Sequence, residues 1–420
     1  SFKVEIPGGG LENIYKSSKL AEITNSTNIH SWKQKGNTII GKLNFTDGSQ
    51  YWGRFENSIA MNYSGDTFVA GNKENDEGTS GSDAGITQIY RWNDVSWNQL
   101  GQNIYGEANG DHSGWATAIN GKGDIVVIGA RYNDDGPGNN GGHARVYQYN
   151  DTSWNQIGQD IDGEANDDRS GWSTSINKTG NIVAIGAKFN DAAGSNSGHV
   201  RVYEYNDVSW NKLGQDIDGE ASDDYSGWSV SLNESGKIVA IGALYNDGAG
   251  TNSGHVRVYE YNDVSWNKIG QDIDAIHADE RLGYSVSIDA TGSILAIGEG
   301  DNSNDGMVLI YNWNQNTQLW DFNTRFYSYQ NDDRFGRSVA ISSDGTTLIA
   351  GSPTFDSNGN EKGLLRMYHS PNKVTEDSFH INALTDISGM LNVKGSFKVD
   401  IPGGGLENIY KSSKLAEITN

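Results

Sequence analysis

The chain has 420 residues, of which 54 are acidic and 31 basic, giving a formal net charge of −23. That charge argues against nucleic-acid partners, and no apolar run approaches the roughly 18 residues that membrane insertion requires. Cysteine is absent, which excludes disulfides and thiolate chemistry. The chain contains 54 Gly and 43 aromatic residues (12 Trp, 20 Tyr and 11 Phe). This composition favours many short strands joined by turns over disorder.

An internal repeat of about 56 residues organises most of the chain. Equivalent positions fall at Glu56, Gly114, Gly171, Gly227, Gly283 and Gly336, which are 58, 57, 56, 56 and 53 residues apart. Six copies at one period are typical of a repeat architecture.

Each copy is predicted to contain four strands, A to D, as the segment 228–270 illustrates. Residues 228–233 alternate between apolar and polar side chains, and residues 238–242 form an unbroken apolar run typical of a doubly buried strand. Residues 255–261 and 265–270 provide two more strands, separated by a short Asn-Asp turn. Four antiparallel strands without helices form a propeller blade, so the prediction is an all-β, six-bladed β-propeller.

The first part of the chain is predicted to close the ring. The sixth copy lacks a tryptophan-bearing strand after His369, whereas residues 31–39 match the fourth strand at residues 96–104. An N-terminal strand that completes the last blade would remove the open sheet edge. A seven-bladed ring is the alternative, but the segment 41–55 is too short for a further blade.

A second repeat is longer. Residues 1–25 recur at residues 396–420, an offset of 395 residues, with Glu5 replaced by Asp400. We therefore expect a β-rich connector at 1–29, the propeller at 30–372 and a second β-rich connector at 373–420. The recurrence indicates one period of a tandem array of propellers; a duplicated flanking tag or linker is the alternative. The pattern of residues 406–415 fits either a short helix or a strand.

The blades resemble the FG-GAP repeat of integrin-α-type propellers. The sixth copy carries the likeness best, in Phe335-Gly336, Asp344-Gly345 and the segments 348–353 and 363–368. The resemblance covers roughly residues 30–370 and implies the fold. Calcium-binding members of that family carry an Asp-x-Asp-x-Asp-Gly loop between strands A and B, and here that place holds plain turns. The segment 386–395 resembles segments of large fibre-like surface proteins of marine bacteria and giant algal viruses.

Acidic loops between strand D and the next strand A are the best candidates for a metal site. Asp160, Asp162, Glu164, Asp167 and Asp168 recur in the next copy as Asp216, Asp218, Glu220, Asp223 and Asp224. Hard oxygen ligands at alternate positions around a glycine suit Ca²⁺. The simpler interpretation is a solvated rim loop whose repetition reflects blade duplication.

Histidine and tryptophan also recur from blade to blade. His143, His199 and His255 open strand C, where a ring of imidazoles would suit a transition metal, but their separation on different blades favours a structural role. The tryptophans are expected to pack between blades, although exposed rings can also bind sugars. They are Trp32, Trp97, Trp154, Trp210 and Trp266 on strand D, and Trp115, Trp172 and Trp228 on strand A.

No catalytic residue is predicted, because nucleophile-elbow, zincin and phosphate-loop motifs are absent and the carboxylate pairs recur between blades. The leading hypothesis is a non-enzymatic structural subunit of an extracellular, cell-surface or virion-surface fibre, whose partners are neighbouring copies of the same unit. The alternative is an adhesion module that binds a glycan or a surface protein, with calcium as a cofactor.

Overall fold

The computed structural model describes residues 59–76, 81–300, 306–328, 333–353 and 364–370, together with short segments at 3–4, 12–13, 391–393, 397–399, 407–410 and 416–418. The chain divides into two compact units, one of residues 36–370 and one of residues 1–35 with 371–420. The larger unit is the propeller.

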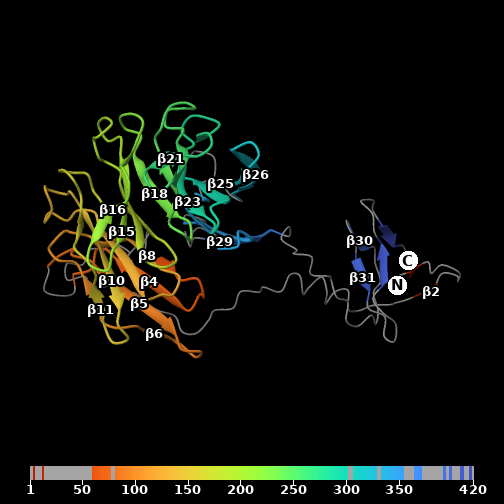
Figure 1. Ribbon diagram of the computed structural model, residues 1–420, viewed down its shortest axis with the longest axis horizontal. Helices are drawn as coiled ribbons and strands as arrows, with labels where there is room; N and C mark the ends of the chain where they lie inside the picture. The colour runs from red at the N-terminus through yellow and green to blue at the C-terminus, as the bar shows by residue number, and fades with distance from the viewer. Residues whose placement is uncertain are drawn as a thin grey trace. The chain divides into compact units, whose positions relative to one another are not determined.

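Six antiparallel sheets follow one another around a ring in chain order, which confirms the predicted all-β, six-bladed propeller (Figure 1). Blade 1 contains β3 (Ile59–Met61), β4 (Thr67–Asn72), β5 (Ile86–Trp92), β6 (Trp97–Gln99) and β7 (Ile104–Tyr105). Blade 2 contains β8 (Ser113–Ile119), β9 (Ile125–Ala130), β10 (His143–Tyr149), β11 (Trp154–Gln156) and β12 (Ile161–Asp162). Blade 3 contains β13 (Ser173–Ile176), β14 (Ile182–Ala187), β15 (His199–Tyr205), β16 (Trp210–Lys212) and β17 (Ile217–Asp218).

The remaining blades follow the same order. Blade 4 contains β18 (Ser226–Leu232), β19 (Ile238–Ala243), β20 (His255–Tyr261), β21 (Trp266–Lys268) and β22 (Ile273–Asp274). Blade 5 contains β23 (Leu282–Ile288), β24 (Ile294–Glu299), β25 (Met307–Asn314) and β26 (Leu319–Tyr327). Blade 6 has three described strands, β27 (Ser338–Ile341), β28 (Thr347–Ser352) and β29 (Leu364–His369). The predicted closing strand at 31–39, with Trp32, lies outside the described residues.

Apolar strands B form the core of each blade, as their sequence predicts. All six residues of β14 are buried, and they pair in register with β15, from Ile182 opposite Glu204 to Ala187 opposite His199. Apolar residues of neighbouring blades then pack into shared clusters, such as the one that joins Val183 and Ile185 to Val146. The core therefore lies between blades as much as within them.

Strand D differs from the prediction, because it is split into two short pieces in blades 1 to 4. In blade 2 both β11 and β12 pair with β10, and His143 lies opposite Asp162. The glycine between the pieces, Gly158, has a φ of 72°, a conformation that interrupts regular strand geometry. The acidic loop therefore begins after Asp162, and Asp162 itself is a strand residue.

Neighbouring blades approach each other at paired glycines. A Cβ atom on Gly186 of β14 would lie 2.3 Å from the carbonyl oxygen of Gly227 in the next blade. The same contact recurs at Gly71 with Gly114, Gly129 with Gly171, Gly242 with Gly283, and Gly298 with Gly336. Only glycine permits such a close backbone approach, which explains why both positions of the repeat carry it.

The turns between strands A and B form a hydrogen-bonded series across five successive blade junctions. The backbone amide of each turn donates to a carbonyl of the next, at 3.0 to 3.3 Å, in the order Tyr63, Gly121, Lys178, Glu234, Ala290 and Ser343. Within one turn, the side-chain oxygen of Asn177 accepts from the amides of Gly180 and Ile182. These turns are stabilised by an asparagine side chain and by the neighbouring blade.

The described residues of the smaller unit form three two-stranded antiparallel pairings. β1 (Lys3–Val4) pairs with β2 (Glu12–Asn13), β31 (Phe397–Val399) with β32 (Glu407–Tyr410), and β30 (Leu391–Val393) with β33 (Ala416–Ile418). The question left open for residues 406–415 is thus answered for 407–410, which form a strand. Lys3 lies opposite Asn13, and Lys398 opposite Asn408, so the two copies of the duplicated block form the same hairpin in the same register.

Candidate functional site

Two of the carboxylates predicted as calcium ligands are buried and hold the loops together. Asp168 and Asp224 are 2% and 3% exposed. Asp168 accepts hydrogen bonds from the amides of Glu164 and Ala165 and from the side chain of Asn190, at 3.0 to 3.2 Å. Asp224 repeats these contacts with Ala221 and Asn246. Their carboxylates thus link the loop after strand D to the loop after strand B.

The neighbouring acidic residues lie in a left-handed backbone conformation. Asp167 and Asp223 have φ values of 61° and 65°. Their carboxylates accept from the side-chain amides of Asn140 and Asn196, at 2.9 and 2.8 Å. Short polar side chains tolerate this conformation, so turn geometry explains the choice of aspartate here.

Three other predicted ligands lie beside a histidine: Asp160 at the junction between blades 1 and 2, and Glu164 and Asp216 at the junction between blades 2 and 3. Nδ1 of His143 lies 3.9 Å from carboxylate oxygens of both Glu107 and Asp160. In the next copy, Nδ1 of His199 lies 3.9 Å from Glu164. The atoms of Glu107, His143 and Asp160 lie within 4.8 Å of one another, as do those of Glu164, His199 and Asp216. We call these sets the first trio and the second trio.

The histidines of the two trios are fully buried on strand C. His143 and His199 are both 0% exposed, and neither ring nitrogen of either residue has a hydrogen-bond partner among the residues that the structure describes. Burial, followed by the charge of Arg145, lowers the pKa of His143 to about 3, so its imidazole is neutral. Burial and Arg201 have the same effect on the pKa of His199. Each trio contains one histidine, so imidazoles of different blades do not share one site.

In the third copy, the aspartate beside the histidine is Asp274, which corresponds to Asp162 and Asp218 in the repeat. Nδ1 of His255 lies 4.0 Å from Glu220 and 3.7 Å from Asp274. The carboxylate of Asp218, the last predicted ligand, is 3.9 Å from His199, while its backbone carbonyl accepts from Arg257 at 2.9 Å. The carbonyl of Asp162 accepts from Arg201 in the same way.

The strand D tryptophans join consecutive blades. Nε1 of Trp210 donates to the carbonyl of Ile157 in the preceding blade at 2.9 Å. Gln159 binds the Trp210 backbone twice, because its Oε1 accepts from the amide and its Nε2 donates to the carbonyl. The same glutamine clamp holds Trp154, Trp266 and Trp320. These rings are 2% to 3% exposed and offer no platform for a sugar.

The strand A tryptophans form a column with cations between them. The rings of Trp115, Trp172 and Trp228 follow one another at centroid distances of 5.0 and 5.1 Å. The amine of Lys188 lies 3.6 Å from the ring centroid of Trp172 and 4.0 Å from that of Trp228, and Arg131 lies 3.1 Å from that of Trp115. Burial, and then neighbouring Arg169 and Arg131, lowers the pKa of Lys188 to about 6.

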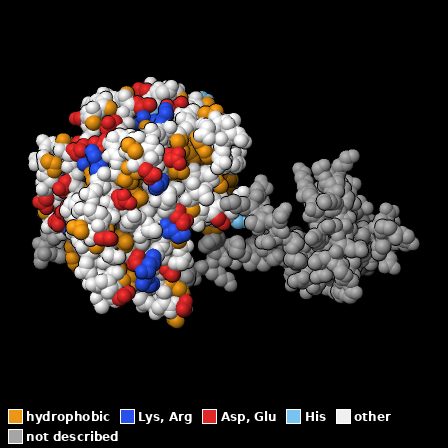
Figure 2. Space-filling view, in the orientation of Figure 1, with side chains coloured by type: hydrophobic (Ala, Val, Ile, Leu, Met, Phe, Trp, Pro, Cys, Tyr) orange, Lys and Arg blue, Asp and Glu red, His pale blue; other side chains and the backbone are white. Residues whose placement is uncertain are grey.

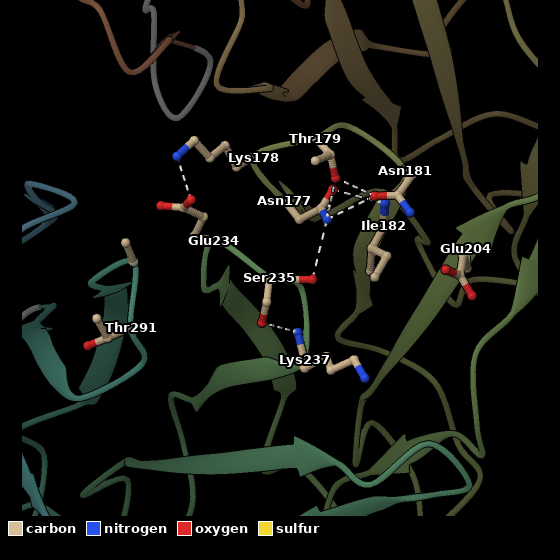
Figure 3. Close-up of a pocket in the computed structure, with 11 residues that line it drawn as sticks. Asn177, Lys178, Thr179, Asn181, Ile182, Glu204, Glu234, Ser235, Lys237 and Thr291 are labelled. Atoms are coloured by element: carbon tan, nitrogen blue, oxygen red, sulfur yellow. Dashed lines mark hydrogen bonds and ion pairs between the residues drawn. The ribbon is translucent and has the colours of Figure 1, made fainter.

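A groove of about 680 Å³ lies beside the A–B turns of blades 3, 4 and 5 (Figure 3). Lys178 and Glu234 form an ion pair at its edge, and Asn177 is engaged in its own turn. Lys237 binds Asp263 at 2.5 Å. These polar groups pair with one another within and between the blades.

Carboxylates are spread over the propeller face seen in Figure 2, with Lys and Arg between them. In the part of the chain that the structure describes, no helix has the length and apolar character needed to cross a membrane.

One segment of the propeller matches a known repeat family. The FG-GAP repeat family matches residues 216–259, which include the glycines of two blade junctions, Gly227 and Gly242. The chain is a β-propeller that contains an FG-GAP repeat.

Solved structures of low sequence identity are similar to this chain. A putative 6-phosphogluconolactonase from Bacteroides uniformis is 13% identical, with a TM-score of 0.50 over 74% of this chain and 82% of that one. A functionally unknown protein from Desulfotomaculum acetoxidans is 12% identical, with a TM-score of 0.48 over 74% and 89%. A periplasmic gluconolactonase from Pseudomonas aeruginosa is 14% identical, with a TM-score of 0.48 over 75% and 89%. The search of curated proteins found no match.

Several site residues of this FG-GAP propeller carry too weak a signal for the sequence to reveal their role. Glu107 was not among the predicted ligands, although it occupies the position of Glu164 in the preceding copy of the same loop, and His143 is distant in the chain from the loop that contains Asp160. The pairing of strand C with the second piece of strand D brings them together, because it places His143 opposite Asp162. Lys188 was also missed; its only sequence signal is a basic residue directly after an apolar strand B.

Proposed function

We propose that this FG-GAP propeller is a non-enzymatic structural unit of an extracellular or surface fibre built from tandem propellers. Neighbouring copies of the unit would be its partners. The observation that carries the proposal is the hairpin that occurs twice, 395 residues apart, with the same residues paired in the same register. A repeated connector on both sides of a propeller is the arrangement that a chain of such units requires.

The polar groups of the blades support a structural role, because they recur at the junctions. Arg145 donates to the carbonyl of Tyr105 in the preceding blade at 2.9 Å and pairs with Glu107 at 3.0 Å. Arg201 and Arg257 make the equivalent contacts one and two blades further on. Side chains that a catalytic site would need are thus used repeatedly to hold the blades together.

The mass of the native polypeptide under denaturing conditions tests this proposal. We expect a mass several times 45.6 kDa, in steps of one 395-residue unit. A native mass close to that of one unit would contradict the tandem array and leave the duplicated hairpin as a flanking feature.

A binding module is the second candidate, and the column of aromatic rings and cations favours it. In a protein with a net charge of −23, the guanidinium of Arg131 lies against the rings of Trp115 and Trp172, and that of Arg169 lies against the ring of Phe189. Cations beside aromatic faces suit an anionic sugar. A glycan array that compares sulfated and carboxylated sugars with neutral ones tests this candidate. Saturable binding of the acidic sugars, lost in Arg131→Gln, would support it, and equal signals for both classes would reject it.

A further inference from the structure

We propose that the first trio, Glu107, His143 and Asp160, binds a divalent transition-metal ion of the Zn²⁺ class at the junction between blades 1 and 2. The site differs in position and chemistry from the A–B loop that binds calcium in other members of the family. It is also independent of the fibre proposal.

The donor set decides the class of ion. One imidazole nitrogen and two carboxylate oxygens suit Zn²⁺, whereas Ca²⁺ prefers oxygen ligands alone. Metal–ligand bonds of about 2.1 Å at a tetrahedral angle place ligand atoms about 3.4 Å apart. Nδ1 of His143 is 3.9 Å from both carboxylates, whose side chains are 34% and 30% exposed, so small rotations of these side chains close the gap.

The buried histidine is the observation that points to a ligand. A buried polar atom normally has a hydrogen-bond partner, because an unpaired one loses its interaction with water. His143 is 0% exposed, and its Nδ1 faces two carboxylates at a distance too long for a hydrogen bond. A metal ion between the three groups supplies the missing partner.

The charges around the first trio also favour a cation. Arg145 pairs with Oε1 of Glu107 at 3.0 Å, and Oε2 of Glu107 is the atom nearest His143. Among the described residues no lysine or arginine pairs with Asp160; Gln156 donates to its Oδ1 and leaves Oδ2 facing the histidine. Two carboxylates therefore face one guanidinium, and a divalent ion compensates the excess negative charge.

The second trio provides a natural control within the same chain. Lys212 occupies the position of Gln156, and its amine lies 3.0 and 3.1 Å from the two oxygens of Asp216. An ammonium group there competes with a metal for the carboxylate. We therefore infer that the first trio binds the metal more tightly than the second.

Calorimetric titration of the full-length chain with Zn²⁺, after removal of metals with EDTA, tests the site. We expect Asp160→Asn to remove the tightest binding step and Gln156→Lys to weaken it about tenfold or more, as changes next to a metal ligand do. Lys212→Gln should leave that step unchanged and strengthen the second one. Asp263→Asn, at an exposed position, serves as the control for general loss of charge.

Thermal unfolding in EDTA shows whether each variant is folded. Gln156→Lys and Lys212→Gln change exposed side chains, so we expect both variants to fold. Zn²⁺ affinity that is unchanged in both Asp160→Asn and Gln156→Lys would overturn the proposal. Equal affinity for Ca²⁺ and Zn²⁺ at this step would overturn it as well, because it would exclude a role for the imidazole.

Discussion

At the scale of single residues, burial is the main cause of the shifted pKa values of Lys188 and Glu299. Lys188 is 5% exposed and its amine faces aromatic rings instead of a carboxylate. Removing the amine from water without a counter-charge disfavours its charged form. The same physics acts on Glu299, which is 5% exposed, and burial followed by the charge of Glu280 raises its pKa to about 8.

We expect Lys188→Met to stabilise the protein, with the largest gain at about pH 6 and below. The pKa of the amine is about 6 in the folded protein, whereas a lysine exposed to water has a pKa of 10.5. Between these values the unfolded chain holds a proton that the folded chain lacks, so wild-type stability rises with pH, by up to about 1.4 kcal/mol per pH unit. Urea midpoints of both proteins between about pH 6 and pH 9 measure the effect. A stability difference that stays constant with pH would contradict the lowered pKa.

At the scale of elements, the link between strand D of one blade and the preceding blade is a hydrogen-bonded clamp around a buried ring. The side chain of Gln159 makes two hydrogen bonds to the backbone of Trp210 and so connects strand D of blade 3 to blade 2. Because the same glutamine recurs in four copies, the junction is a property of the repeat and not of one blade.

Gln159→Ala is expected to lower the free energy of unfolding by about 1 to 3 kcal/mol, because two backbone groups of Trp210 lose their partners. Trp210→Ala should lower it further, by about 3 to 5 kcal/mol, because a large buried ring is removed. Chemical denaturation of each variant measures the loss. Asn211→Ala, on an exposed neighbour, is the control; a Gln159→Ala protein as stable as this control would show that the clamp contributes nothing.

The blades could be predicted from the sequence because strand pattern, turn residues and paired glycines all repeat with one period. The trios could not, because Glu107, His143 and Asp160 belong to separate segments that meet only through strand register. The structural role of Asp168 could not be predicted either, because its hydrogen-bond partner Asn190 lies in another loop. In both cases the repeat identifies recurring polar residues, and the strand pairing determines which of them lie in contact.

At the scale of the whole molecule, consecutive blades are coupled at each of the five junctions from blade 1 to blade 6. Backbone hydrogen bonds connect the A–B turns of consecutive blades, apolar clusters fill the junctions, and glycine pairs bring the backbones into contact. Open repeat arrays unfold in stages because each unit contacts only its neighbours. A ring with such strong junctions should behave as one cooperative unit.

We therefore expect the propeller to unfold in urea in a single transition. Far-UV circular dichroism reports all blades, and fluorescence reports the buried tryptophans of blades 2 to 5, so the two curves should coincide. Two separate midpoints, or a fluorescence change that precedes the loss of strands, would show that individual blades open on their own.

The glutamine clamp has a consequence for how such a protein changes over generations. Gln102, Gln159, Gln215 and Gln271 each meet a tryptophan in the following blade with the same atoms. Unequal recombination that adds or deletes one copy of about 56 residues among blades 1 to 5 would therefore rejoin the remaining blades through the same clamp. The chemistry of the junction sets no limit on the number of blades; the limit comes from the angle at which the ring must close.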